Sequence, residues 1–203
     1  PRVIQDSTMI NVQFHDSPTE IDQQTLQLAS KEAEKSFRKL LDKKVEGSEW
    51  LGWLDFLVDN SSEIDLSALQ DTAKHLQSIS DIVLCIGIGG SYLGTAATLT
   101  ASSSRKENHQ YPEIRFLGTH LGSKELKEVM NELSKKNPNG SKKRVSIIVI
   151  SKSGSTMETG VVFRILRSWL KQHHPEGIQD RVVAITSHSS GSLRNLVDEA
   201  GYE

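Results

Sequence analysis

The sequence predicts an α/β fold, a doubly wound parallel sheet with helices on both faces, preceded by a helical extension. Two observations predict it. Four short apolar runs begin 31 to 37 residues apart, which is the length of one strand plus a crossover helix. The segments between these runs carry apolar residues at helical spacing. Because buried strands that alternate with amphipathic helices are typical of parallel sheets, we expect this architecture over residues 79–203.

The four apolar runs are the expected strands, at residues 82–86, 114–117, 145–150 and 182–185. The first and third runs are more apolar than the second, so we expect them in the centre of the sheet. Helices are expected where apolar residues recur at i, i+3, i+4 and i+7, namely around residues 126–133, 162–169 and 193–200. Gly201 follows the last group as a stop signal.

Residues 1–78 are expected to form a helical extension packed on the sheet, so that residues 1–203 make one domain. Apolar spacing predicts a long helix over about 19–43 and a shorter one over about 66–76. An aromatic loop is expected at 50–55, and the alternation of Ile10, Val12 and Phe14 indicates a short edge strand.

Composition excludes several classes of protein. The 24 Lys and Arg residues nearly balance 26 Asp and Glu residues, which offers no electrostatic footprint for nucleic acid or an anionic membrane. The longest apolar run, 82–86, is too short to cross a bilayer. A single cysteine, Cys85, excludes an intrachain disulfide, suits a cytoplasmic compartment and is expected to be an inert core residue.

Two polar features are expected to carry no chemistry. The seven histidines show no metal-ligand spacing, so we expect no metal site and assign them surface or capping roles. The basic turn 135–144 is expected to be a solvated loop.

The first loop that can bind a ligand is residues 86–94, Ile-Gly-Ile-Gly-Gly-Ser-Tyr-Leu-Gly. Its glycines let the backbone approach a ligand, and the amides of the following helix favour an anion. A dinucleotide is the competing ligand, but Tyr92 stands where the third glycine of G-x-G-x-x-G belongs, and no acidic residue ends the second strand. By itself this loop is equally compatible with tight packing and with anion binding, and Ser91 can either cap the helix or bind the ligand.

The second loop, residues 151–159, offers five hydroxyls and the ammonium of Lys152 just ahead of a helix. Ser155 and Glu158 fit a capping box, a purely structural role. That box does not account for Ser151, Ser153 and Thr156, for which we favour ligand binding.

Topology joins the two loops. In a sheet of flavodoxin-like order 2-1-3-4-5, strands 1 and 3 are neighbours, and ligands bind beyond their carboxyl ends. We therefore expect a shared phosphate pocket in which the ligand lies across Gly89, Gly90, Ser91 and residues 151–156.

These two loops resemble the sugar isomerase (SIS) domain family, and within it the glucose-6-phosphate isomerases. Residues 86–94 are similar to the signature G-I-G-G-S-x-L-G, and residues 151–159 to S-K-[ST]-x-[ST]-T-x-E-[TP]. Residues 52–55 resemble the start of a third stretch, G-W-x-D-L-P, from which Phe56 and Leu57 depart. The resemblance covers roughly residues 45–203.

The resemblance implies a sugar phosphate as the small-molecule substrate, no cofactor, and interconversion of glucose 6-phosphate and fructose 6-phosphate through a cis-enediol, a step of glycolysis and gluconeogenesis. The implied substrate-binding residues are Gly89, Gly90, Ser91, Ser151, Lys152, Ser153, Ser155 and Thr156. It places the catalytic carboxylate, histidine, lysine and arginine, together with a fifth strand, beyond Glu203. We therefore expect this chain to be the amino-terminal half of an enzyme that is a homodimer at full length, and to be inactive alone.

Two alternatives remain open at this point. SIS domains also serve as non-catalytic sugar-phosphate sensors in regulators, and as amino-sugar phosphate isomerases. Residues 1–78 carry a long helix and an acidic stretch in place of a DNA-reading helix pair, and the Gly-Gly-Ser-x-Leu-Gly match is unusual for the amino-sugar enzymes.

Overall fold

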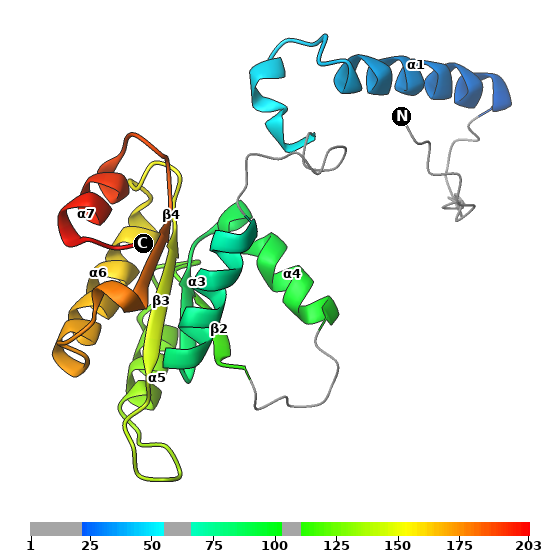
Figure 1. Ribbon diagram of the computed structural model, residues 1–203. Coiled ribbons are helices and arrows are strands. Elements are labelled where there is room, and N and C mark those ends of the chain that lie inside the picture. The colour runs from blue at the N-terminus through cyan, green and yellow to red at the C-terminus, as the bar shows by residue number, and fades with distance from the viewer. Residues whose placement is uncertain (1–21, 55–65, 103–110) are drawn as a thin grey trace. The chain divides into compact units, whose positions relative to one another are not determined.

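The computed structural model describes residues 22–54, 66–102 and 111–203, which belong to two units divided after Ile64 (Figure 1). The predicted edge strand at Ile10–Phe14 lies outside the described residues. In the first unit, α1 (Gln23–Leu41) begins later and ends earlier than the predicted helix 19–43. Its start is fixed by the N-cap Asp22, whose Oδ1 accepts a hydrogen bond of 2.7 Å from the amide of Thr25.

The predicted aromatic loop at 50–55 is partly wrong. Ser48–Trp50 form a 3₁₀ turn, η1, and residues 52–54 are helical. Gly47 precedes η1 in the left-handed conformation, with φ of 81°, which redirects the chain into the turn. The side chains of Trp50 and Trp53 are exposed within the described part of the chain.

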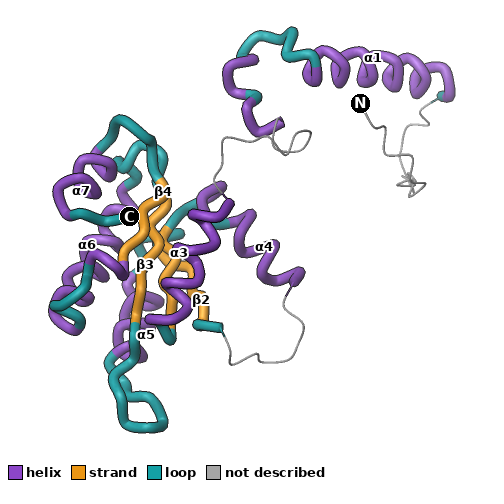
Figure 2. Tube along the Cα trace, viewed as in Figure 1, coloured by secondary structure: helices purple, strands orange, loops and turns teal. Residues whose placement is uncertain are grey.

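The second unit contains a four-stranded parallel sheet of order β2-β1-β3-β4 (Figures 1 and 2). The strands are β1 (Ile82–Ile86), β2 (Glu113–Leu117), β3 (Val145–Ile150) and β4 (Val182–Ile185). Each lies within one residue of its prediction, and the order confirms the first four strands of the expected 2-1-3-4-5 arrangement. Beside β4, the amide of Ala184 donates a 2.7 Å hydrogen bond to the carbonyl of Glu203.

The main core lies on one face of this sheet. It contains alternate strand residues such as Leu84 and Ile147, both fully buried, packed against side chains of three helices. These are α5 (Ser123–Leu133), α6 (Met157–His173) and α7 (Ser192–Ala200). Helix α7 stops at Gly201, which is left-handed with φ of 68°, as the sequence predicts.

Helices α3 (Leu66–Ile79) and α4 (Leu93–Ser102) lie on the opposite face of the sheet (Figure 1). The ring of Tyr92, just before α4, lies 5.6 Å from that of Phe116, a β2 residue out of phase with the main core. Leu76 is the buried residue of α3, and α4 has none among the described residues. Both faces carry helices, as predicted, but the second face is covered thinly.

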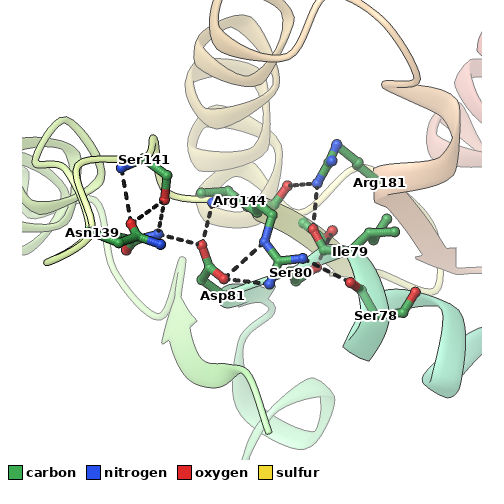
Figure 3. A network of polar contacts seen from close by, with 11 residues as sticks. Ser78, Ile79, Ser80, Asp81, Asn139, Ser141, Arg144 and Arg181 are labelled. Atoms are coloured by element: carbon green, nitrogen blue, oxygen red, sulfur yellow. Dashed lines mark hydrogen bonds and ion pairs between the residues drawn. The ribbon is translucent and has the colours of Figure 1, made fainter. Parts of the chain in front are cut away.

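A network of polar contacts connects the segments at the amino ends of β1, β3 and β4 (Figure 3). The Asp81 carboxylate accepts hydrogen bonds of 2.6 and 3.0 Å from the Arg144 guanidinium and of 2.9 Å from Asn137. The Arg181 guanidinium donates to the carbonyls of Ile79 and Val145, at 3.0 and 3.3 Å. Because these contacts join segments that precede β1, β3 and β4, they hold the strands in register and leave the carboxyl ends free for loops.

Candidate functional site

The two predicted loops begin at neighbouring strand ends. We call residues 86–94 the glycine loop and residues 151–159 the hydroxyl loop. Ile86 of β1 is paired with Val149 of β3, so the two loops leave the same edge of the sheet. This is the carboxyl edge, where ligands of doubly wound sheets bind. A shared site is expected if the first and third strands are neighbours, and the observed strand order places β1 beside β3.

The glycines of the first loop have different physical causes. A β-carbon on Gly87 would lie 3.0 Å from Cβ of Ser91, so glycine is needed there for packing. Gly89 has φ of 57°, which only glycine adopts at little cost, and it opens the 3₁₀ turn Gly89–Ser91 (η2). Gly90 has neither constraint: its φ is not positive, and no atom lies within 4 Å of a built β-carbon. Open space beside Gly90 fits a backbone that a ligand approaches closely.

The second loop is ordered by hydrogen bonds of its own. Ser151 is 4% exposed, and its Oγ accepts from the amide of Gly154 at 3.1 Å. The hydroxyls of Ser153 and Ser155 are 2.7 Å apart, and the amide of Ser155 donates to Ser153 Oγ at 3.2 Å. Lys152 is exposed, and its carbonyl accepts from the amide of Ser187 at 3.2 Å.

The predicted capping box is wrong. Thr156, one residue beyond Ser155, is the N-cap of α6, and no side chain of the described residues makes a capping hydrogen bond there. Ser155 is paired with Ser153 instead of with Glu158. The first amides of α6 therefore receive no side-chain acceptor at the cap, which leaves the amino end of this helix suited to an anion.

Helix α7 shapes the hydroxyl loop, a contact that the sequence did not reveal. A β-carbon on Gly154, at φ of 71°, would lie 2.2 Å from the backbone nitrogen of Leu193. One on Gly191, at φ of 106°, would lie 2.6 Å from the carbonyl oxygen of Ser153. Two glycines distant in sequence thus allow backbone-to-backbone contact between the loop and the start of α7.

A cavity of about 420 Å³ lies between α6, α7 and the end of β3. Three predicted residues, Ser151, Ser155 and Thr156, line it. Five others do not, since Gly89, Gly90, Ser91, Lys152 and Ser153 are not among its lining residues. The described cavity therefore does not join the two loops, although they leave paired strands.

Sequence reasoning missed two cations of this cavity. Arg164 and Arg167 line it from α6, on the helical face that begins at Met157. Arg167 Nε donates a 2.6 Å hydrogen bond to the Tyr202 hydroxyl, while Arg164 is exposed. Their spacing from the hydroxyl loop, about two turns along α6, was the available signal.

The cavity also contains an unusual buried hydroxyl. Thr159 is 2% exposed, and its Oγ1 has no hydrogen-bond partner among the described residues. A buried hydroxyl without a partner costs free energy, so Thr159 is a polar group that the described residues leave unsatisfied.

The remaining expectations concern histidine, cysteine and metals. His15 and His109 lie outside the described residues, and the described chain holds no group of three His, Cys, Asp or Glu residues able to bind a metal. His174 is the C-cap residue of α6, where its amide donates to the carbonyl of Leu170 at 2.8 Å, which agrees with the expected capping role. Cys85 is buried, and burial raises the pKa of its thiol to about 11, as expected for an inert core residue. No helix in the described segments is both long and apolar enough to span a membrane.

Comparisons with known proteins identify related sequences and a similar fold. The model of the family "Phosphoglucose isomerase" matches residues 62–200. The chain is 40% identical over 159 residues to glucose-6-phosphate isomerase of Staphylococcus epidermidis and 38% identical to that of Staphylococcus aureus, covering 77% of this chain and 34% of each relative. It thus spans about a third of their length. A solved structure of a hypothetical protein from Thermus thermophilus matches with a TM-score of 0.66 and 26% identity, over 89% of this chain and 39% of that one.

Proposed function

Because this chain belongs to the phosphoglucose isomerase family, we propose that it is the phosphate-anchoring part of an enzyme that interconverts glucose 6-phosphate and fructose 6-phosphate. The observation that carries the proposal is the hydroxyl loop at the uncapped amino end of α6. Hydroxyls and helix amides are neutral donors that hold a phosphate dianion in place. The near balance of charge in the chain fits such a site.

We assign the phosphate to Ser91, Ser151, Lys152, Ser153 and Thr156, with Gly89, Gly90 and Ser155 lining the sugar phosphate. Support comes from the paired strand ends, from the open space beside Gly90, and from the lack of a side-chain cap from the described residues at Thr156. The buried Ser151 holds the turn closed through Gly154, and the side chains of Lys152 and Ser153 are exposed at this turn.

The chemical step we propose is transfer of a proton between C1 and C2 of the open-chain sugar through a cis-enediol. We place the base, the ring-opening group and the cation that stabilises the enediolate outside residues 1–203. The role of this chain is then positional, since phosphate binding supplies the free energy that orients C1 and C2 for the reaction. We further propose that the whole enzyme is a cytoplasmic homodimer.

Binding and turnover test this proposal separately. Fructose 6-phosphate, titrated into the chain by calorimetry, should bind weakly, and Ser153→Ala with Thr156→Ala should lower the affinity about tenfold or more, the effect of losing two hydrogen bonds to an anion. The exposed Ser168 of α6 is the matched control, and Ser168→Ala should leave the affinity unchanged. Equal affinities in the double variant and the parent would refute the phosphate site. Isomerase turnover by the chain alone would refute its purely positional role.

A further inference from the structure

A second cavity lies at the amino end of the sheet, at the opposite edge from the two loops. Its volume is about 280 Å³. The ends of α5 and α6 and both arms of the hairpin 134–144 line it, with Leu133 and Trp169 forming its apolar part. A cavity of this size accommodates a small metabolite and is too small for a nucleotide.

The walls of this cavity carry an unusual concentration of positive charge. Four lysines and two histidines line it: Lys135, Lys136, Lys142, Lys143, His173 and His174. Lys136 and Lys142 are directly opposite each other in an antiparallel bridge, a pairing that places both side chains on the same side of the hairpin. Like charges on one side of a hairpin repel each other, and an anion bound between them would relieve this repulsion.

Carboxylates neutralise little of this charge. Within the described residues, Glu132 is the acid in ion-pair contact with these lysines, at 3.4 Å from Lys143 Nζ. The same carboxylate is shared with the Arg115 guanidinium, at 2.5 and 2.8 Å. No carboxylate of the described chain pairs with Lys136 or Lys142.

The two histidines contribute a buried nitrogen to the same wall. The His173 ring stacks on Trp169 at 4.1 Å, and its Nδ1 donates a 2.8 Å hydrogen bond to the Trp169 carbonyl. His174 Nε2 is buried and has no partner in the described part of the chain. Burial, followed by the charge of Arg181, lowers the pKa of His174, and a hydrogen bond with the backbone of Lys143 opposes this shift. A solvated basic turn, the role expected from the sequence, accounts for exposed lysines but not for a cavity that these lysines line together with Leu133 and Trp169.

We propose that the cavity between the hairpin 134–144 and the end of α6 is a binding site for a small phosphorylated anion. The lysine ammonium groups provide both the charge and the hydrogen bonds to the phosphate oxygens. This site is independent of the hydroxyl loop, so the failure of either proposal leaves the other standing.

Trp169 provides a local probe of binding, because it lines the cavity. The chain has three tryptophans, and Trp50→Phe with Trp53→Phe leaves Trp169 as the sole tryptophan, which is excited selectively over the three tyrosines. Pyrophosphate titrated into this background should change the Trp169 emission saturably. Lys136→Gln with Lys142→Gln should weaken that binding about tenfold or more, since two charge-assisted contacts are lost. Both lysines are exposed, so the unfolding midpoint should not change.

Two matched variants complete the design. Lys124→Gln removes an exposed lysine of α5 that does not line the cavity, and should leave the pyrophosphate affinity unchanged. Ser153→Ala with Thr156→Ala should leave the Trp169 response unchanged as well, since these residues belong to the other end of the sheet. The proposal is overturned by a Trp169 emission indifferent to pyrophosphate, by equal affinities with and without Lys136 and Lys142, or by a response that disappears only in the Ser153 and Thr156 variant.

Discussion

The backbone of Leu193 lies so close to Gly154 that a β-carbon on the glycine would be 2.2 Å from the Leu193 nitrogen. This contact binds the hydroxyl loop to the first turn of α7. The loop geometry is therefore set by a helix that follows the next strand, and not by the loop sequence alone.

Gly154→Ala should distort the loop and destabilise the fold. The alanine would have to adopt φ of 71° and displace backbone atoms of α7, which costs about 1–3 kcal/mol. Urea unfolding followed by circular dichroism measures the loss. Gly160→Ala is the matched control: Gly160 is helical, no atom lies within 4 Å of a built β-carbon, and the change should stabilise the chain by about 0.5–1 kcal/mol. Equal stabilities of the two variants would contradict the contact with Leu193.

The buried hydroxyls of Ser80 and Ser146 should be strongly coupled. They are 2.6 Å apart, and Ser146 is fully buried. Either single alanine variant leaves one hydroxyl buried without a partner and should lower the free energy of unfolding by about 1–2 kcal/mol. The double variant removes both groups and should be more stable than the sum of the single losses predicts. A double-mutant cycle measured by urea unfolding tests this, and strict additivity would exclude the pair.

Asp81 should make stability depend on pH. Burial opposes its ionisation, but hydrogen bonds from Arg144 and Asn137 outweigh burial and lower the pKa of Asp81 below its ordinary value. Its stabilising effect is therefore present above about pH 4, the pKa of an unfolded aspartate, and is lost as pH falls through the folded pKa. Asp81→Asn should cost about 1–2 kcal/mol at pH 7, because Arg144 is half exposed, and the difference from the parent should shrink below pH 4.

Unfolding by urea at pH 7 and pH 3 measures that difference. Asp198→Asn is the control, because Asp198 pairs with Arg194 on the surface of α7 and should change stability by less than about 0.5 kcal/mol at either pH. A difference between the parent and the Asp81→Asn variant that is constant with pH would show that the Asp81 carboxylate contributes no charge-dependent stability.

The Cys85 thiol should resist modification while the chain is folded. Burial raises its pKa to about 11, so the reactive thiolate is scarce at pH 8 and is shielded by the sheet. Reaction with a disulfide reagent should be about 100-fold slower than in unfolding concentrations of urea, as followed by absorbance. Comparable rates in the two conditions would contradict the buried position of this strand residue.

The spacing of apolar residues was sufficient to predict the four strands and the helices α5, α6 and α7 of the second unit. The strand runs 82–86, 145–150 and 182–185 match the observed strands, because continuous apolar residues are required in strands covered by helices. The central position of the first and third strands in the order 2-1-3-4 agrees with their more apolar sequences. The family signatures sit at the two loops, and the family match confirms that interpretation.

Packing between segments distant in sequence determined the position of the α6 cap and the residues that line the two cavities. The N-cap of α6 is Thr156 and not Ser155, because the Ser155 hydroxyl is hydrogen-bonded to Ser153. The backbone of α7 also lies close to Gly154 and constrains the loop. The sequence predicts that the hydroxyl loop binds phosphate, and this stays a prediction. Only the tertiary structure showed that Arg164 and Arg167 share its cavity, and that the basic turn encloses a second cavity against His174. Periodicity reports which side of an element is buried, whereas a cavity depends on what packs opposite it, and that partner comes from elsewhere in the chain.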